Sequence, residues 1–247
     1  MKSLLRILQI VYSVYALIMF CLIMFLVLPF VLLALLFGKI KGGNIIYKIC
    51  TAWASTWYFF IGIRHKEIYE APINKKSQYI FIANHISYLD IPALVRSVRQ
   101  PVRALGKKEM VHWPVFGWIY RSAAVLVDRS SPEKRAKSVR ALKSAIDHGV
   151  SIFIFPEGTF NETGKPLKDF FDGAFRIAIE TQTPILPMIF PDTIKRMHYR
   201  GFFELIPGIC RTIFLKEIPV EGLHIKDLPV LKEKAFQQME AAILKYR

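Results

Sequence analysis

The sequence predicts an α/β fold, with a mixed central sheet flanked by helices and an N-terminal hydrophobic helical membrane anchor. Residues 7–38 carry no formal charge, and 28 of these 32 residues are hydrophobic. After residue 65, short apolar runs rich in β-branched and aromatic residues alternate with amphipathic helical patterns, as in sheets covered by helices. We therefore expect a membrane-embedded or interfacial helical anchor over residues 1–65 and an α/β domain over residues 66–247.

The uncharged run 7–38 is too long for a signal peptide, and no A-x-A-like cleavage site ends it. As one helix, 32 residues would measure about 48 Å, against roughly 30 Å for the hydrocarbon core of a bilayer. The helix therefore either tilts or extends into the interface, or it breaks near Pro29 and turns back. Basic residues flank both ends of the run. They fit a hairpin with both ends cytoplasmic, which is the arrangement we expect.

A second uncharged stretch, residues 49–63, contains five aromatic residues. Aromatic residues at this density are typical of the headgroup boundary of a membrane. An aromatic helix buried within the domain accounts for them nearly as well. Both interpretations remain open from the sequence.

Short apolar runs bounded by polar or turn residues predict the strands of the domain. The first helix between them has Ser131 as a cap, Pro132 at its first position and Gly149 as its stop signal. The expected strands are residues 79–83, 124–127, 151–155, 185–190 and 212–215; the expected helices are residues 132–148, 174–181 and 231–244.

The chain has 34 Lys and Arg against 19 Asp and Glu, a net charge of +15. Residues 96–143 hold 12 of the basic residues and only 3 acidic ones. Such a surface suits anionic lipid, an acidic substrate or an acidic carrier protein, whereas no nucleic-acid-binding motif accompanies it. Three widely spaced cysteines fit neither a disulfide framework nor a zinc site, so we expect reduced thiols and no metal.

Two polar segments at predicted strand ends carry candidate chemistry. Asp90 follows His85 by five residues, which allows it to accept a hydrogen bond from one imidazole nitrogen and leave the other as a base. The spacing alone does not single out a catalytic pair, because Glu70 follows His65 at the same offset. The second segment, residues 155–159, reads Phe-Pro-Glu-Gly-Thr. It offers a carboxylate and backbone N–H groups suited to a polar ligand.

Together, the sequence Asn84-His85-x4-Asp90 and the Phe-Pro-Glu-Gly-Thr segment resemble the glycerolipid acyltransferase superfamily. The similarity is to its bacterial 1-acyl-sn-glycerol-3-phosphate (lysophosphatidate) acyltransferases in particular. Residues 107–129 and 185–189 look like the second and fourth motifs of that family. The resemblance covers roughly residues 66–220, which makes residues 66–247 an acyltransferase domain.

The resemblance implies an enzyme of phospholipid biosynthesis. It would move a fatty acyl group from an acyl thioester to the free hydroxyl of 1-acyl-sn-glycerol-3-phosphate, giving phosphatidic acid. Acyl-CoA or acyl-carrier protein would be the co-substrate, with no cofactor. The expected partners are the phospholipid bilayer and a lysophospholipid acceptor, and no nucleic acid. The catalytic domain would lie on the cytoplasmic face of the inner membrane.

Seven residues receive roles from the resemblance. His85 would be the general base that activates the acceptor hydroxyl for direct attack, and Asp90 would orient its imidazole. No Ser or Cys stands in a nucleophile elbow, so no covalent acyl-enzyme is expected. The other five residues would bind the acceptor: Lys107 and Arg129 at its phosphate, and Glu157, Gly158 and Thr159 at the glycerol phosphate.

The chain departs from the family pattern at two positions. Phe160 follows Thr159 where the family usually continues with Arg, and Asp172 stands where the family often has Lys. The loss of two candidate phosphate contacts leaves an amino-acid-containing lyso-lipid open as an alternative acceptor. A non-catalytic, membrane-tethered protein that binds lipid or acyl-carrier protein ranks lower, because binding requires neither His85 nor Asp90.

Overall fold

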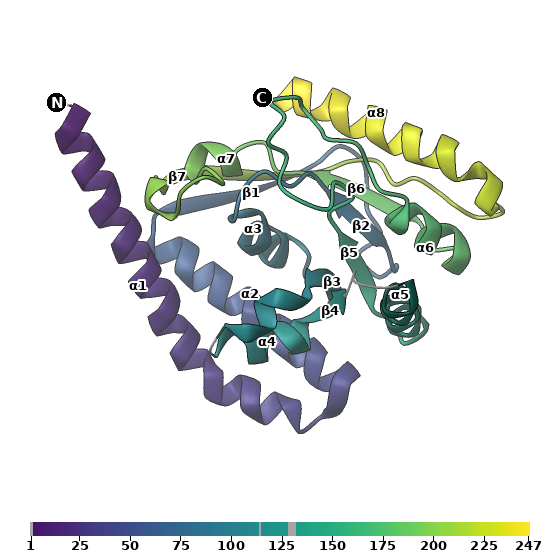
Figure 1. The fold of residues 1–247 in the computed structure, drawn as a ribbon, viewed down its shortest axis with the longest axis horizontal. Coiled ribbons are helices and arrows are strands. Elements are labelled where there is room, and N and C mark those ends of the chain that lie inside the picture. The colour runs from purple at the N-terminus through teal and green to yellow at the C-terminus, as the bar shows by residue number, and fades with distance from the viewer. Residues whose placement is uncertain (1, 114, 128–131) are drawn as a thin grey trace.

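A mixed sheet organises the α/β part of the chain, as the computed structural model shows for residues 2–113, 115–127 and 132–247 (Figure 1). The strands are β1 (Ile63–Tyr69), β2 (Ile80–Ala83), β3 (Val102–Lys107), β4 (Ala124–Val127), β5 (Ser151–Ile154), β6 (Ile185–Ile189) and β7 (Gly208–Phe214). The helices are α1 (Lys2–Leu35), α2 (Gly43–Phe60), α3 (Asp90–Ser97), α4 (Phe116–Ala123), α5 (Pro132–Asp147), α6 (Gly173–Thr181), α7 (Thr193–Arg196) and α8 (Leu228–Tyr246). Shorter helical segments are η1 (Gly38–Gly42), η2 (Lys108–His112), η3 (Phe202–Glu204) and η4 (Ile225–Asp227).

The strand order is β1-β7-β6-β2-β5-β3-β4. The strands from β6 to β4 run parallel to one another, and β6 pairs with β7 in the antiparallel sense. The predicted mixed sheet is therefore confirmed. All five expected strands are present, and the expected Ser131 cap lies outside the described residues.

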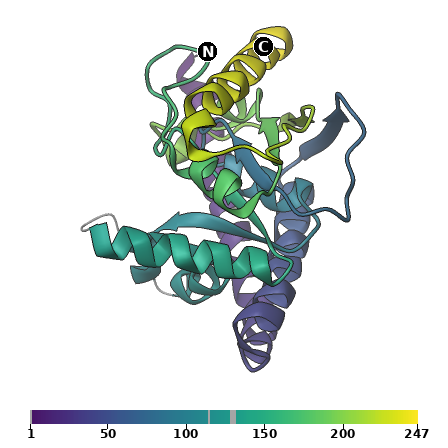
Figure 2. The same ribbon diagram turned by 90° about the vertical axis from the view of Figure 1, so that its right-hand side faces the viewer.

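Successive residues of the central strand β2 serve opposite faces of the sheet. Ile80 and Ile82 belong to the apolar core under α5, α6 and α8, whereas Phe81 and Ala83 pack on the α3 side. Figure 2 shows the sheet with helices on both sides. Because both faces are covered, β2, β5 and β6 are buried along their whole length and read as continuous apolar runs in the sequence.

Two strands, β1 and β3, were not predicted from the sequence. β1 is an edge strand in which only Ile63 is buried, and it carries several charges, while β3 includes Arg103 and Lys107. Charged residues in a strand weaken the apolar signal from which strands are predicted. Since β1 starts at Ile63, the sheet begins a few residues before the expected domain boundary.

The N-terminal hairpin consists of α1 and α2. The indole N–H of Trp57 donates to the carbonyl of Ala16 (2.8 Å), and that of Trp53 donates to the carbonyl of Phe20 (3.3 Å). These pairings run in opposite directions along the two helices, which are therefore antiparallel. Trp53 and Trp57 are buried, so this part of the second uncharged stretch is an aromatic helix packed between α1 and the domain.

The expected break near Pro29 is wrong, because Pro29 lies inside α1, which continues to Leu35. A break would leave the unpaired backbone groups of two helix ends within an apolar segment, whereas a helical proline forfeits one hydrogen bond. The chain reverses instead through η1. At Gly43 a Cβ atom would overlap the guanidinium of Arg103, so the absence of a side chain there lets β3 approach the turn.

The hairpin is attached to the α/β domain at two places, near the N-terminus of α1 and at the η1 turn that follows α1. At the turn, buried Arg103 donates to the carbonyls of Lys39 (3.3 Å) and Ile40 (3.1 Å). Near the N-terminus, the Gln9 amide donates to the Glu204 carbonyl of η3 (3.0 Å). The remaining surface of α1 is largely exposed and apolar, with a mean hydropathy of 3.1 over its best window. By length and composition α1 can cross a membrane, yet its contacts place it along the flank of the domain.

Candidate active site

The candidate site lies at the carboxyl end of β2, in the middle of the sheet. β2 is flanked by β5 and β6, so the segments that follow these three parallel strands meet at one edge. The side chain of Asn84 joins two of them: its Oδ1 accepts from the N–H of Phe190 (2.8 Å), just after β6. The backbone carbonyl of His85 accepts from the N–H of Asn161 (2.7 Å), in the loop after β5.

Asp90 is fully buried at the start of α3 and holds the loop that precedes it. Its Oδ2 accepts hydrogen bonds from the backbone N–H groups of Ile86 (2.7 Å) and Ser87 (2.8 Å). The same oxygen lies 2.9 Å from Nδ1 of His85. Since backbone N–H groups can only donate, we assign Oδ2 as an acceptor and the proton to Nδ1. Nε2 of the neutral imidazole is then free to accept a proton, as a general base must.

Aromatic rings surround the imidazole of His85, whose side chain is 18% exposed. It stacks on Phe155 with ring centroids 3.8 Å apart, and Phe160 lies against it at 4.3 Å. The row continues from Phe160 to Tyr88 (4.9 Å) and from Tyr88 to the exposed ring of Phe202 (4.5 Å) in η3. This row of rings runs from the imidazole to η3, the segment that Gln9 of α1 contacts. The rings offer an apolar surface on which a hydrocarbon chain can lie.

Glu157 connects the loop after β2 to a later part of its own loop, the one after β5. Its carboxylate is fully buried; one oxygen accepts from the N–H of His85 (2.8 Å) and the other from the N–H of Lys168 (2.9 Å). Burial raises the pKa of this carboxyl to about 7, although the two N–H groups favour the charged form. Both oxygens are engaged by backbone groups, which suits a residue that positions the loops.

The raised pKa of Glu157 predicts a pH-dependent stability. Between pH 4.5 and about 7 the folded chain retains a proton that the unfolded chain releases, so the free energy of unfolding falls as pH rises. The slope is about 1.4 kcal/mol per pH unit for one such group. Substitution with Gln removes the titrating group, so Glu157→Gln should flatten the profile by that amount in urea unfolding measured in a neutral detergent. Glu162→Gln, at an exposed carboxylate of the same loop, is the control; equal slopes for Glu157→Gln and wild type would contradict the prediction.

Gly158 and Thr159 form the turn after β5. Gly158 has a φ of +73°, a left-handed conformation that favours glycine. Thr159 is exposed, and its Oγ1 accepts from the ammonium of Lys168 (2.7 Å). The turn therefore presents a hydroxyl and an ammonium group to solvent, next to Phe160 and the imidazole that it covers.

The side chains of the two expected phosphate-binding cations lie outside the part of the chain that the structure describes. Lys107 ends β3, two strands away from β2, and only its backbone is described. Arg129 lies outside the described residues. Among the described residues, no group of three His, Cys, Asp or Glu side chains is placed to hold a metal ion.

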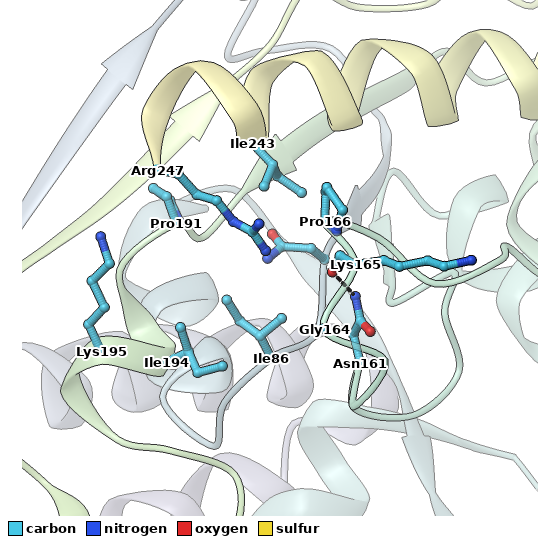
Figure 3. Close-up of a pocket in the computed structure, with 11 residues that line it drawn as sticks. Ile86, Asn161, Gly164, Lys165, Pro166, Pro191, Ile194, Lys195, Ile243 and Arg247 are labelled. Carbon is cyan, nitrogen blue, oxygen red and sulfur yellow. Dashed lines mark hydrogen bonds between the residues drawn. The ribbon is translucent and has the colours of Figure 1, made fainter.

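A cavity of about 260 Å³ borders the loop that holds His85. Asn84 and Ile86 line it, but His85 itself does not, so the imidazole is not part of the cavity wall. In Figure 3 the guanidinium of Arg247 reaches toward this space, whereas the side chain of Lys165 points away from it.

Sequence reasoning missed Lys168 and the packing role of Phe160. Lys168 is nine residues beyond Thr159, and no periodic pattern relates the two positions. Phe160 is visible in the sequence only as a departure from the family pattern. Its contact with His85 depends on how the loops after β2 and β5 fold against each other.

A family model described as Acyltransferase matches residues 65–191. A 1-acyl-sn-glycerol-3-phosphate acyltransferase of Cocos nucifera is 34% identical over 46% of this chain and 37% of its own length. The enzyme of that name from Haemophilus influenzae is 27% identical over 80% of this chain and 84% of its own. The chain spans less than half the length of the first curated relatives it matches.

The fold also matches a solved structure. It resembles a 1-acyl-sn-glycerophosphate acyltransferase from Thermotoga maritima with a TM-score of 0.75 at 22% identity. The match covers 100% of this chain and 99% of the other. The arrangement of helices on a mixed sheet, including the N-terminal helices, is thus one already known.

Proposed function

The chain belongs to the acyltransferase family, and from this premise we propose that it transfers a fatty acyl group from an acyl thioester to the free hydroxyl of 1-acyl-sn-glycerol-3-phosphate. The product is phosphatidic acid. The observation that carries the proposal is the contact between His85 Nδ1 and buried Asp90, 2.9 Å long. It lies in the loop after β2, whose His85 N–H donates to Glu157 of the Phe-Pro-Glu-Gly-Thr segment. The relatives with this named activity support the choice of acceptor.

In the proposed reaction, Nε2 of His85 takes the proton of the acceptor hydroxyl as its oxygen attacks the thioester carbonyl. The tetrahedral intermediate then expels the thiolate, which takes the proton back from the imidazolium. Asp90 remains ionised and stabilises the positive imidazolium through Nδ1. The aromatic rings on the imidazole keep water from its faces.

The remaining predicted site residues divide into two groups. We propose that Lys107 and Arg129 bind the acceptor phosphate, where an ammonium and a guanidinium suit a dianion. Gly158 and Thr159 would contact the glycerol phosphate from the exposed turn. Glu157 would act as a positioning residue, because both of its oxygens accept backbone N–H groups.

An acceptor panel tests the proposed function. The purified protein would be supplied with labelled acyl-CoA or acyl-carrier protein, and with lysophosphatidate or other lyso-lipids. Preferred transfer to lysophosphatidate supports the proposal, and the two donors identify the thioester. Transfer to no acceptor would favour the non-catalytic binding protein.

Two observations favour a second acceptor, an amino-acid-containing lyso-lipid. Asp172 stands where the family often has Lys, and it pairs with Lys232 at 2.6 Å. Phe160 covers His85 where the family usually has Arg. If the panel shows transfer to an amino-lipid and none to lysophosphatidate, the enzyme class stands and the acceptor changes.

We also propose that the hairpin is monotopic and lies on the cytoplasmic face of the inner membrane. The exposed apolar side of α1 suits the interface of a bilayer. Contacts near its N-terminus and at the η1 turn that follows it support a helix lying along the membrane, since crossing the bilayer would separate one end from the domain. Basic Lys39 and Lys41 in the turn suit anionic headgroups.

Cysteine labelling tests this topology. In a background without Cys21, Cys50 and Cys210, both Ser3→Cys and Lys41→Cys should react with an impermeant reagent only from the cytoplasmic side. Lys226→Cys, at an exposed position of the α/β domain, provides the reference for that side. Labelling of residue 3 or residue 41 from the opposite side would show that α1 crosses the membrane.

A further inference from the structure

Lys168 is fixed to the same carboxylate as the candidate base. The backbone N–H groups of Lys168 and His85 donate to the two oxygens of Glu157, at 2.9 and 2.8 Å. The ammonium of Lys168 then reaches the exposed hydroxyl of Thr159 at 2.7 Å. One buried side chain therefore sets the relative position of a base and a cation, whose side chains both reach the surface of the site.

The charge of Lys168 has no carboxylate partner among the described residues within ion-pair distance. Two other lysines on this side of the sheet are neutralised: Lys143 by Glu180 at 2.7 Å and Lys232 by Asp172 at 2.6 Å. Lys168 instead donates to a neutral hydroxyl. Its ammonium has three hydrogens, so donors remain for a ligand.

The position of Lys168 also supplies a positive charge that the chain lacks at two positions of the family pattern. Phe160 and Asp172 remove basic side chains from the two positions where the family pattern supplies them. Lys168 belongs to neither position, yet its ammonium lies on Thr159, the residue before Phe160. A phosphate next to the reacting hydroxyl of an acceptor needs a cation close to the base but not in contact with it.

We propose that Lys168, held by Thr159 and Glu157, binds the phosphate of the acceptor and sets the preference for a phosphate-bearing lyso-lipid. The proposal rests on the acyltransferase function proposed above and adds a residue that the family motifs do not include. Thr159 serves as a tether that aims the ammonium at the anion.

Steady-state kinetics of the full chain test the proposal. Lysophosphatidate is compared with 1-acylglycerol, the same acceptor without its phosphate. Lys168→Met should raise KM for lysophosphatidate about 10-fold, the lower range for a lost charge-assisted hydrogen bond, and leave KM for the acyl donor unchanged. KM for 1-acylglycerol should not change, and Lys168→Arg should restore lysophosphatidate binding. The matched control is Lys165→Met, in the same loop with its side chain directed away from the cavity (Figure 3).

Unchanged KM for lysophosphatidate in Lys168→Met would overturn the proposal, and so would equal losses on both acceptors, which would indicate a structural role. If Lys168→Met does not fold, Lys168→Gln decides: it removes the charge but keeps a polar side chain, so it should raise KM for lysophosphatidate alone, and no change would refute the role of Lys168. A wild-type protein that ignores lysophosphatidate and uses another acceptor refutes the acceptor assignment itself. If the wild-type protein uses lysophosphatidate and Lys168→Met leaves KM for it unchanged, only the role of Lys168 is refuted.

Discussion

Replacing His85 with alanine is expected to reduce the acyl-transfer rate by about 10²–10⁴-fold, the usual contribution of a positioned general base. The acceptor hydroxyl is a poor nucleophile while protonated, and Nε2 of His85 is the nitrogen left free by the bond to Asp90. The measurement is turnover of purified protein with saturating acyl donor and lysophosphatidate.

The His85→Ala protein should still fold and associate with membranes, because the buried network of Asp90 with Ile86 and Ser87 does not require the imidazole. His148→Ala is the matched control, since His148 is exposed after α5 and its imidazole bonds to the carbonyl of Ser144 in that helix. His148→Ala should retain wild-type turnover. Near-wild-type turnover of His85→Ala would refute the general-base mechanism.

Asp90→Asn should give the second large loss, about 10- to 150-fold in turnover, which corresponds to ~1.5–3 kcal/mol for a charge-assisted hydrogen bond. An amide oxygen can replace Oδ2 and still accept the bonds from Ile86 and Ser87, so the loop should keep its shape. What is lost is the negative charge that stabilises the imidazolium of His85. The loss should therefore be smaller than that of His85→Ala.

A double variant separates orientation from structure. If Asp90 acts only through His85, adding Asp90→Asn to His85→Ala should lower turnover no further. A further loss in the double variant would mean that Asp90 contributes independently of the imidazole. Melting temperatures of the single and double variants, measured in the same detergent, check that the losses are not due to unfolding.

Much of the fold follows from local patterns in the sequence. Strands β2, β5 and β6 are continuous apolar runs because helices cover both faces of the sheet. Strands β1 and β3 could not be found in this way, since charged residues interrupt their apolar pattern. The pairing of β1 with β7 joins residues more than 140 positions apart, and no local window contains that information.

The hairpin shows a similar division. The length and apolarity of residues 7–38 predict an anchor, and α1 is long and apolar enough to be one. The place of the turn was wrong, because Pro29 suggests a break only when the helix is considered alone. The turn lies where η1 meets Arg103, and that contact involves a strand from another part of the chain.

The α/β class, the long N-terminal apolar helix and the spacing that brings His85 to Asp90 can all be predicted from the sequence, because each depends on residues that are neighbours along the chain. The surroundings of the imidazole cannot, because they are made by tertiary contacts. Phe160 covers it, and Glu157 ties the backbone of His85 to that of Lys168. These contacts join loops that follow different strands, and the parallel order of β2 and β5 brings those loops together at one edge of the sheet.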